Sequence, residues 1–135
     1  MHLIVCIDEK DGLSFCGRRL SRDSVLNNHI LALTAGHKLR MSPYSAPLFP
    51  EGAVCAELDF LQKAARGDYC FLEVSTLPET NKQLESVILY HWNRTYPSTV
   101  KFPRALLEGM QLTYTEEFSG NSHEKITMER YTYEA

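Results

Sequence analysis

The chain has 135 residues, of which 44% are hydrophobic and 23% charged, proportions typical of a folded globular domain. Fourteen Lys and Arg residues against seventeen Asp and Glu residues give a net charge of −3, which excludes a global basic field that would hold the protein on nucleic acid or an anionic membrane. We predict a single domain over residues 1–135, long enough to fold without a disulfide or metal staple.

The charge is unevenly distributed along the chain. Residues 1–50 carry six basic and four acidic side chains, whereas residues 105–135 carry two basic and six acidic ones. An anionic ligand is therefore expected in the N-terminal third.

No apolar run approaches the roughly 18 residues of a membrane span, and no signal-peptide core precedes Asp8, so the sequence predicts a cytoplasmic protein without a membrane partner. The four cysteines are expected to be buried, reduced thiols: Cys6, Cys16, Cys55 and Cys70.

The first part of the chain alternates strands with short helices. The apolar, β-branched run His2–Ile7 predicts a strand buried on both faces. Ser21 is expected to cap a helix that runs to about Thr34 and carries Asp23 in its first turn. Further strands are expected at 37–41, 54–57 and 68–74, with helical character at 59–65. This alternation predicts an α/β fold.

The last part of the chain has a different pattern. Residues 86–92 form a strongly apolar strand, and segments 111–118 and 124–133 alternate apolar and polar residues around Ser119-Gly120-Asn121. The sequence therefore predicts a central mixed sheet, with 2–7 and 86–92 in its middle and a C-terminal antiparallel hairpin at one edge.

Several segments together resemble one known family. LIVCIDEKDGL at 3–13 and KLRMSPYS at 38–45 are similar to the opening strand and loop, and to the second strand and following helix start, of the dihydrofolate reductases. LESVILYHWNRTYPSTVKFP at 84–103 resembles their long strand with a loop ending in Phe-Pro, and 111–133 their final hairpin with its Asn-Ser-His segment. The resemblance implies a dihydrofolate reductase-like three-layer sandwich.

The chain departs from that family where a nicotinamide cofactor would bind. The resemblance implies a glycine pair after the strand at 68–74, where backbone amides meet the pyrophosphate, but DYCFLEVSTLPE contains no glycine. The family's segment after the second strand is replaced by Met41-Ser42-Pro43-Tyr44, in which the Ser42 hydroxyl could bind a phosphate or cap a helix. No cofactor is therefore expected; NADPH is the cofactor if the family's activity is retained.

The segment Gly17–Asp23 is the strongest candidate ligand site. It places three guanidiniums and a carboxylate, those of Arg18, Arg19, Arg22 and Asp23, beside the predicted helix. Arginines bind phosphate or carboxylate through a planar fork, and the resemblance implies that a carboxylate on this helix pairs with a pterin. The structural alternative is that Asp23 favours the helix dipole and pairs with Arg19 or Arg22 at the surface.

Other patterns support fewer functions. Trp92 to Arg104 interleaves aromatic and basic residues as single-strand nucleic-acid platforms do, although core packing of these aromatics is the favoured interpretation. The histidines form no zinc-binding motif, so a zinc hydrolase is excluded and no metal site is expected, and His29 is expected to be a satisfied core histidine. No nucleophile elbow is present, although a triad assembled only in space leaves no sequence signal.

These patterns predict a catalytically degenerate dihydrofolate reductase-like binding module for a small anionic or nucleotide-like ligand near Arg18, Arg19, Arg22 and Asp23. The first alternative is an NAD(P)H-dependent oxidoreductase of the dihydrofolate reductase class. The second is a local RNA or nucleotide-binding protein that uses the 92–104 segment. Whether the protein is an enzyme is left open by the sequence.

Overall fold

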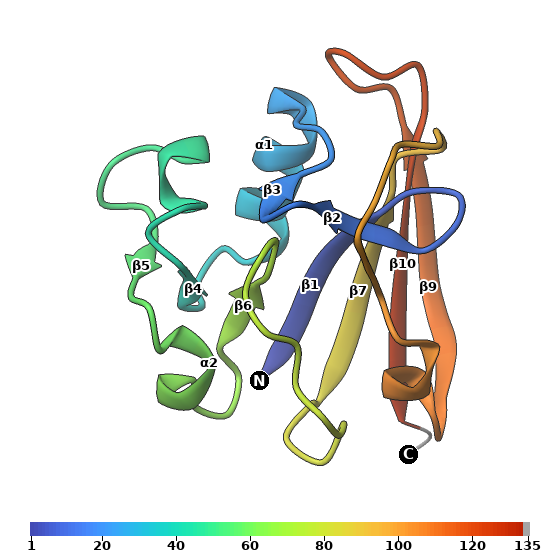
Figure 1. Ribbon diagram of the computed structural model, residues 1–135. Helices are drawn as coiled ribbons and strands as arrows, with labels where there is room; N and C mark the ends of the chain where they lie inside the picture. Colours follow the sequence, from blue (N-terminus) through green and yellow to red (C-terminus); the bar gives the residue numbers. More distant parts are fainter. Residues whose placement is uncertain (134–135) are drawn as a thin grey trace.

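The computed structural model describes residues 1–133 and is built around a seven-stranded mixed sheet (Figure 1). The five strands β5, β4, β6, β1 and β7 pair in parallel, and β10 pairs antiparallel with both β7 and β9. The strands follow the order β5 (Cys55–Ala56), β4 (Leu39–Met41), β6 (Tyr69–Phe71), β1 (His2–Ile7), β7 (Ser86–His91), β10 (Ile126–Tyr133) and β9 (Met110–Phe118). The predicted mixed sheet, its two central strands and its C-terminal hairpin at an edge are confirmed.

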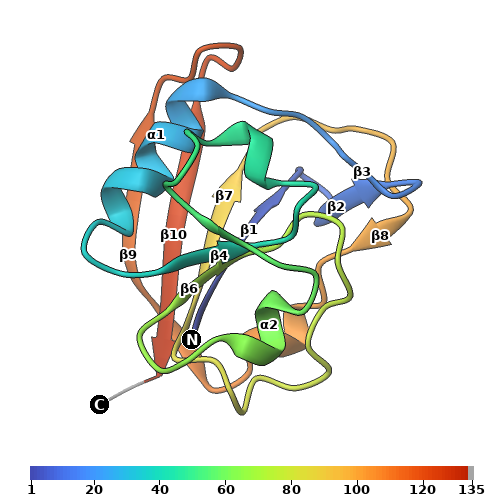
Figure 2. The ribbon, with the colours of Figure 1, turned by 90° about the vertical axis from the view of Figure 1, so that its left-hand side faces the viewer.

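The two central strands are buried on both faces, as their apolar runs predict. Leu3, Val5 and Ile7 point into one core, whereas Ile4 and Cys6 point into the other. Helix α1 (Ser24–Leu33) covers the second core, and α2 (Phe60–Lys63) with the 3-10 turn η2 (Arg104–Leu107) covers the first. Figure 2 shows α1 and α2 on opposite sides of the sheet.

A small second sheet was not predicted. It has the strand order β3 (Arg18–Arg19), β2 (Gly12–Phe15) and β8 (Val100–Lys101). The β2–β3 turn is tight because Cys16 and Gly17 both adopt positive φ angles, of 49° and 75°. This turn carries the arginines of β3 over the end of the main sheet where its parallel strands finish (Figure 1).

Three expectations need correction. Ser21 does not cap α1: the helix begins at Ser24, and Asp23 is its N-cap rather than a first-turn residue. Its carboxylate replaces the serine hydroxyl because it lies directly before the first helical amides. The cysteines are free thiols, but Cys16 is exposed and Cys55 only partly buried, so the expectation that all four are buried is wrong for these two.

Among residues 1–133, no helix is long and apolar enough to cross a membrane.

Candidate functional site at the carboxyl ends of the strands

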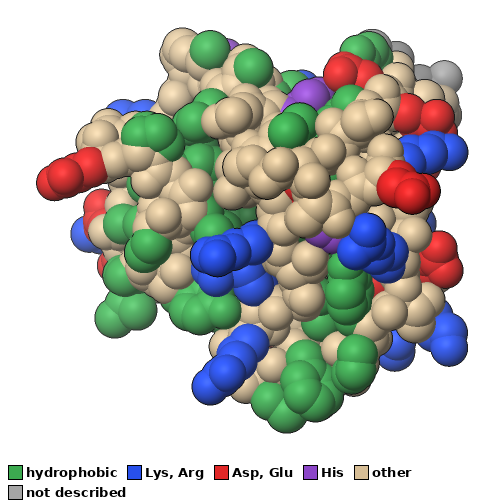
Figure 3. Space-filling model, turned by 90° about the horizontal axis from the view of Figure 1, so that it is seen from above, with side chains coloured by type: hydrophobic (Ala, Val, Ile, Leu, Met, Phe, Trp, Pro, Cys, Tyr) green, Lys and Arg blue, Asp and Glu red, His purple; other side chains and the backbone are tan. Residues whose placement is uncertain are grey.

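The parallel strands β1, β4, β6 and β7 end at the same edge of the sheet, the usual location of ligand sites in open α/β folds. Figure 3 looks onto this edge and shows Lys and Arg side chains in separate groups rather than as one continuous basic field. Three connecting segments of the chain lie together here: the segment between β2 and α1, the turn after β4, and the loop between β9 and β10.

Arg19 forms an ion pair with Glu73, the second residue after β6. Its Nε donates to both carboxylate oxygens at 3.2 and 3.0 Å, and its Nη2 donates to Oε1 at 3.1 Å. Glu73 is 8% exposed and also accepts the Ser45 hydroxyl at 2.7 Å, while the Arg19 guanidinium lies 4.4 Å from the centre of the Tyr44 ring. The pair is therefore largely shielded from solvent.

The segment that contains Arg19 also fills the end of the sheet. Arg19, Leu20 and Ser21 close a hollow whose floor includes Cys6, Glu73 and Trp92. Its volume is about 10 Å³, room for about one water molecule. Burial, reinforced by the nearby Glu73 carboxylate, raises the pKa of the Cys6 thiol well above its usual range, so this thiol stays protonated.

Asp23 binds two parts of the chain through one buried carboxylate. As the N-cap it accepts the amides of Val25 at 2.9 Å and Leu26 at 3.2 Å. It also accepts the amides of Asn121 at 2.9 Å and Ser122 at 2.8 Å from the β9–β10 loop. Burial alone would raise the pKa of Asp23, but these donors and the His123 ring outweigh it and hold the pKa well below its usual range.

His123 completes this arrangement and was missed as a functional residue by sequence reasoning. Its Nδ1 lies 3.0 Å from Asp23 Oδ2, and its Nε2 lies 3.1 Å from both Ser21 Oγ and Tyr96 Oη. The ring is 3% exposed and stacks on Trp92 at a centroid distance of 4.6 Å. We call the contacts of Asp23 with 121–123 the α1 clamp. The only sequence signal for it was the Asn-Ser-His segment.

Gly120 is required for the α1 clamp to close. A Cβ at this position would collide with the Asp23 carboxylate, which its hydrogen bonds fix in place. A glycine therefore lets the β9–β10 loop approach the start of α1 closely enough for its amides to bond the carboxylate.

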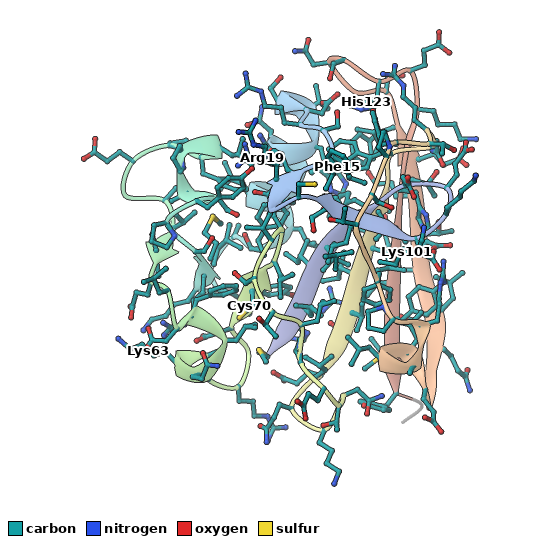
Figure 4. The ribbon with its side chains drawn as sticks, viewed as in Figure 1. Phe15, Arg19, Lys63, Cys70, Lys101 and His123 are labelled. Atoms are coloured by element: carbon teal, nitrogen blue, oxygen red, sulfur yellow. The ribbon has the colours of Figure 1, made fainter. Side chains whose placement is uncertain are left out.

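Arg18 and Arg22 are exposed, and neither forms an ion pair within residues 1–133. Arg22 and Asp23 line a hollow of about 420 Å³ between the start of α1 and the 3-10 turn η1 (Ala46–Leu48). The other residues at this hollow are Ser24, Asn27, Pro47, Leu48, Asn121 and Ser122. The four predicted ligand residues therefore do not share one cavity: Arg19 belongs to the strand-end hollow, and Arg22 and Asp23 to the second one. Figure 4 places Arg19 and His123 apart at this end of the sheet.

Ser42, the predicted phosphate contact, is 7% exposed and lies directly after β4. Its carbonyl accepts the amides of Ser45 at 3.1 Å and Ala46 at 3.2 Å, and so forms the turn that leads into η1. A role of the Ser42 hydroxyl in cofactor binding stays a prediction.

The aromatic residues of the 92–104 segment pack inward, as the favoured interpretation held. Trp92 and Phe102 are 3% and 2% exposed, and Arg104 pairs with Asp11 at 2.9 Å. His29 is satisfied by Tyr90 Oη at 2.8 Å and by Glu116 at 3.0 Å. Within residues 1–133, no group of three or more His, Cys, Asp or Glu side chains could hold a metal ion.

Comparison with known proteins identifies the fold. No known family model and no curated protein matches the chain. In structure it is similar to dihydrofolate reductase from Enterococcus faecalis complexed with NADP(H) and RAB-propyl, with a TM-score of 0.66 over 97% of this chain and 94% of that one, at 11% sequence identity. The chain therefore has a dihydrofolate reductase-like fold, as the resemblance in sequence predicted.

Proposed function

We propose that this chain is a binding module on a dihydrofolate reductase-like fold, catalytically degenerate as a reductase, and that its ligand is a small anionic or nucleotide-like molecule. The observation that carries the proposal is the unpaired Arg22 guanidinium at the hollow between α1 and η1. A planar guanidinium without a protein partner binds phosphate or carboxylate without first breaking an ion pair. Arg18, also exposed and unpaired, is the second candidate contact.

The strand end supports the loss of reductase chemistry. No glycine follows the strand at 68–74, where the resemblance places the family's glycine pair. Beside that position the buried Arg19–Glu73 ion pair occupies the strand end, so a pyrophosphate would meet two paired side chains instead of open backbone amides. The residues that the chain carries at this position do not fit a nicotinamide dinucleotide, so no step is assigned to one.

Thermal unfolding with inorganic pyrophosphate and with AMP tests the ligand proposal. A ligand at 100 times its dissociation constant adds about 2.7 kcal/mol, a rise in the unfolding midpoint of roughly 10 °C for a domain of this size. We expect Arg22→Lys to reduce the shift and Arg22→Ala to abolish most of it. Arg66→Ala is the matched control, because its side chain is 95% exposed and Arg66 lies apart from the proposed site. Equal shifts in all four proteins, or no shift with either probe, would contradict the proposal.

The second candidate function is an NAD(P)H-dependent reductase, favoured by the NADP(H) complex of the structural neighbour. Its test is NADPH oxidation in the presence of dihydrofolate. Turnover above the rate without protein would replace the binding-module proposal, whereas its absence together with pyrophosphate or AMP binding would support it.

A further inference from the structure

Asp23, His123 and Ser21 form a continuous hydrogen-bonded relay that no motif in the sequence announces. Asp23 Oδ2 lies 3.0 Å from His123 Nδ1, and His123 Nε2 lies 3.1 Å from Ser21 Oγ. The Asp and His side chains are 0% and 1% exposed. A hydroxyl bonded to an imidazole that is itself oriented by a carboxylate is the arrangement by which acyl-transfer enzymes activate a serine, and it recurs on unrelated folds.

The surroundings fix which nitrogen carries the proton. Asp23 is held ionised by its amide donors, so its carboxylate can only accept a hydrogen bond. We therefore assign the His123 proton to Nδ1, which faces Asp23 Oδ2 and also lies 3.1 Å from Ser122 Oγ. This assignment leaves an unprotonated Nε2 that faces the hydroxyls of Ser21 and Tyr96 and can take the proton of Ser21. Trp92 stacks on the ring and holds it in this orientation.

Tyr96 supplies a second hydroxyl at the same point. Its Oη lies 3.1 Å from His123 Nε2, as close as Ser21 Oγ. When Nε2 takes up the serine proton it stops accepting from Tyr96, and the phenol is then free to donate to negative charge that develops beside Ser21.

We propose that Ser21 is a nucleophile toward small carboxylic esters, a reaction distinct from the ligand binding assigned to Arg22. Ser21 Oγ attacks the ester carbonyl while its proton passes to His123 Nε2. The carbon–oxygen bond to the alcohol then breaks, and the leaving alkoxide takes the proton from Nε2. Water, activated by the same nitrogen, attacks the acyl group, the bond to Ser21 breaks, and the serine recovers its proton. Asp23 stays ionised and stabilises the imidazolium in both halves of the reaction.

The hollow beside Ser21 restricts the acyl group. At about 10 Å³ it has room for about one water molecule, so it accepts a methyl group but not an alkyl chain. Acetyl esters are therefore the expected class, and long-chain esters are expected to react at least 10-fold more slowly.

The experiment treats the full chain with p-nitrophenyl acetate and, separately, with a fluorophosphonate probe, and locates the adduct by mass spectrometry of peptides. We expect modification at Ser21 in the parent protein and no adduct at position 21 in Ser21→Ala. His123→Gln, which removes the base and keeps the hydroxyl, is expected to slow both acylation and phosphonylation of Ser21 at least about 100-fold, the lower range for general-base catalysis. Ser119→Ala is the control, because Ser119 is an exposed serine of the β9–β10 loop that carries His123, and this variant should react like the parent protein.

Two results would overturn the proposal: no adduct on Ser21 with either reagent, or equal rates in the parent protein and Ser21→Ala. Ser21→Ala removes one partly exposed hydroxyl, so we expect this variant to fold, and an unchanged unfolding midpoint verifies that it does. Ser21→Ala therefore decides the question even if His123→Gln unfolds. Equal rates for p-nitrophenyl acetate and p-nitrophenyl octanoate would overturn the assignment of acetyl esters. None of these readouts depends on pyrophosphate or AMP, so this proposal and the ligand proposal fail separately.

Discussion

Removal of the Asp23 carboxylate is expected to cost about 3–5 kcal/mol of folding free energy. Loss of a side-chain N-cap alone costs about 1 kcal/mol. Asp23→Ala also leaves the His123 ring and the β9–β10 loop without their shared acceptor, and removing one partner of a buried ion pair or hydrogen bond adds about 1–3 kcal/mol per buried group. The donors that lose this acceptor are Val25 N, Leu26 N, Asn121 N, Ser122 N, Ser122 Oγ and His123 Nδ1.

Asp59→Ala is the matched control for this substitution. Asp59 is the N-cap of α2 but makes no side-chain cap hydrogen bond, and its side chain is 58% exposed. We expect its loss to cost less than about 0.5 kcal/mol. Urea unfolding followed by the emission of Trp92, the only tryptophan, measures both variants, and Trp92 also reports on the α1 clamp because it stacks on His123. A cost below about 1 kcal/mol for Asp23→Ala, or equal costs for the two variants, would refute the reasoning.

The pH dependence of the same measurement follows from the lowered pKa of Asp23 in the folded protein. A carboxyl group whose folded pKa lies below its unfolded value stabilises the fold above the unfolded pKa, about 3.9, and loses that contribution as the pH falls toward the folded value. The stability difference between the parent protein and Asp23→Ala should therefore be full at pH 7 and shrink below about pH 4. A difference that stays constant down to pH 2 would show that the carboxylate charge is not the source of the effect.

Three further predictions concern the rest of this region and the start of the chain. Arg19→Ala should cost about 2–4 kcal/mol in urea unfolding because it leaves the buried Glu73 charge unpaired, and adding Glu73→Gln should recover most of it; no recovery in the double variant would contradict the ion-pair explanation. Hydrogen bonds from the Met1 ammonium and from the Gly67 backbone amide lower the pKa of Glu85 to about 2. Glu85→Gln should therefore destabilise the protein at pH 7 but progressively less between pH 4.5 and 2. A loss of stability that persists at pH 2 would contradict this origin. NADPH should fail to saturate the emission of Trp92 below about 100 μM, and saturation at low micromolar cofactor would show that the missing glycine pair is not decisive.

The main sheet was predictable because its signals are local. His2–Ile7 and 86–92 carry apolar residues at most positions on both faces of the strand, and the C-terminal hairpin alternates around Gly120. The small sheet was not predictable for the opposite reason: its strands have two to four residues, and Gly12 pairs with Lys101, which no local pattern connects to it. The displaced helix start has a similar cause, because Ser21 and Asp23 are both good caps and only the path of the preceding chain selects between them.

The place of the 17–23 segment in the fold was predictable, but the contacts of its side chains were not. The sequence drew attention to 17–23 through its density of charge, and this segment does lie at the carboxyl ends of the strands. The partners of that charge come from elsewhere: Glu73 lies 54 residues from Arg19, and His123 lies 100 residues from Asp23. A lone buried acid after a strand and a lone histidine in a hairpin loop carry no pattern by themselves, so the ion pair and the relay are visible only after folding.

Two sets of buried contacts together restrict access to the strand ends. The Arg19–Glu73 ion pair fixes one end of the segment that covers the hollow, and the hydrogen bonds of the α1 clamp to Asp23 fix the other. Breaking the ion pair costs about 2–4 kcal/mol, which lowers the apparent affinity of any ligand that needs the segment open by about 30-fold to nearly 1,000-fold. A dinucleotide at the strand ends would therefore need an intrinsic dissociation constant in the nanomolar range to bind at micromolar concentration. The hollow at Arg22 lies outside this cover, so a ligand there is bound without that cost, and this difference favours Arg22 over the strand ends as the place where an anion binds.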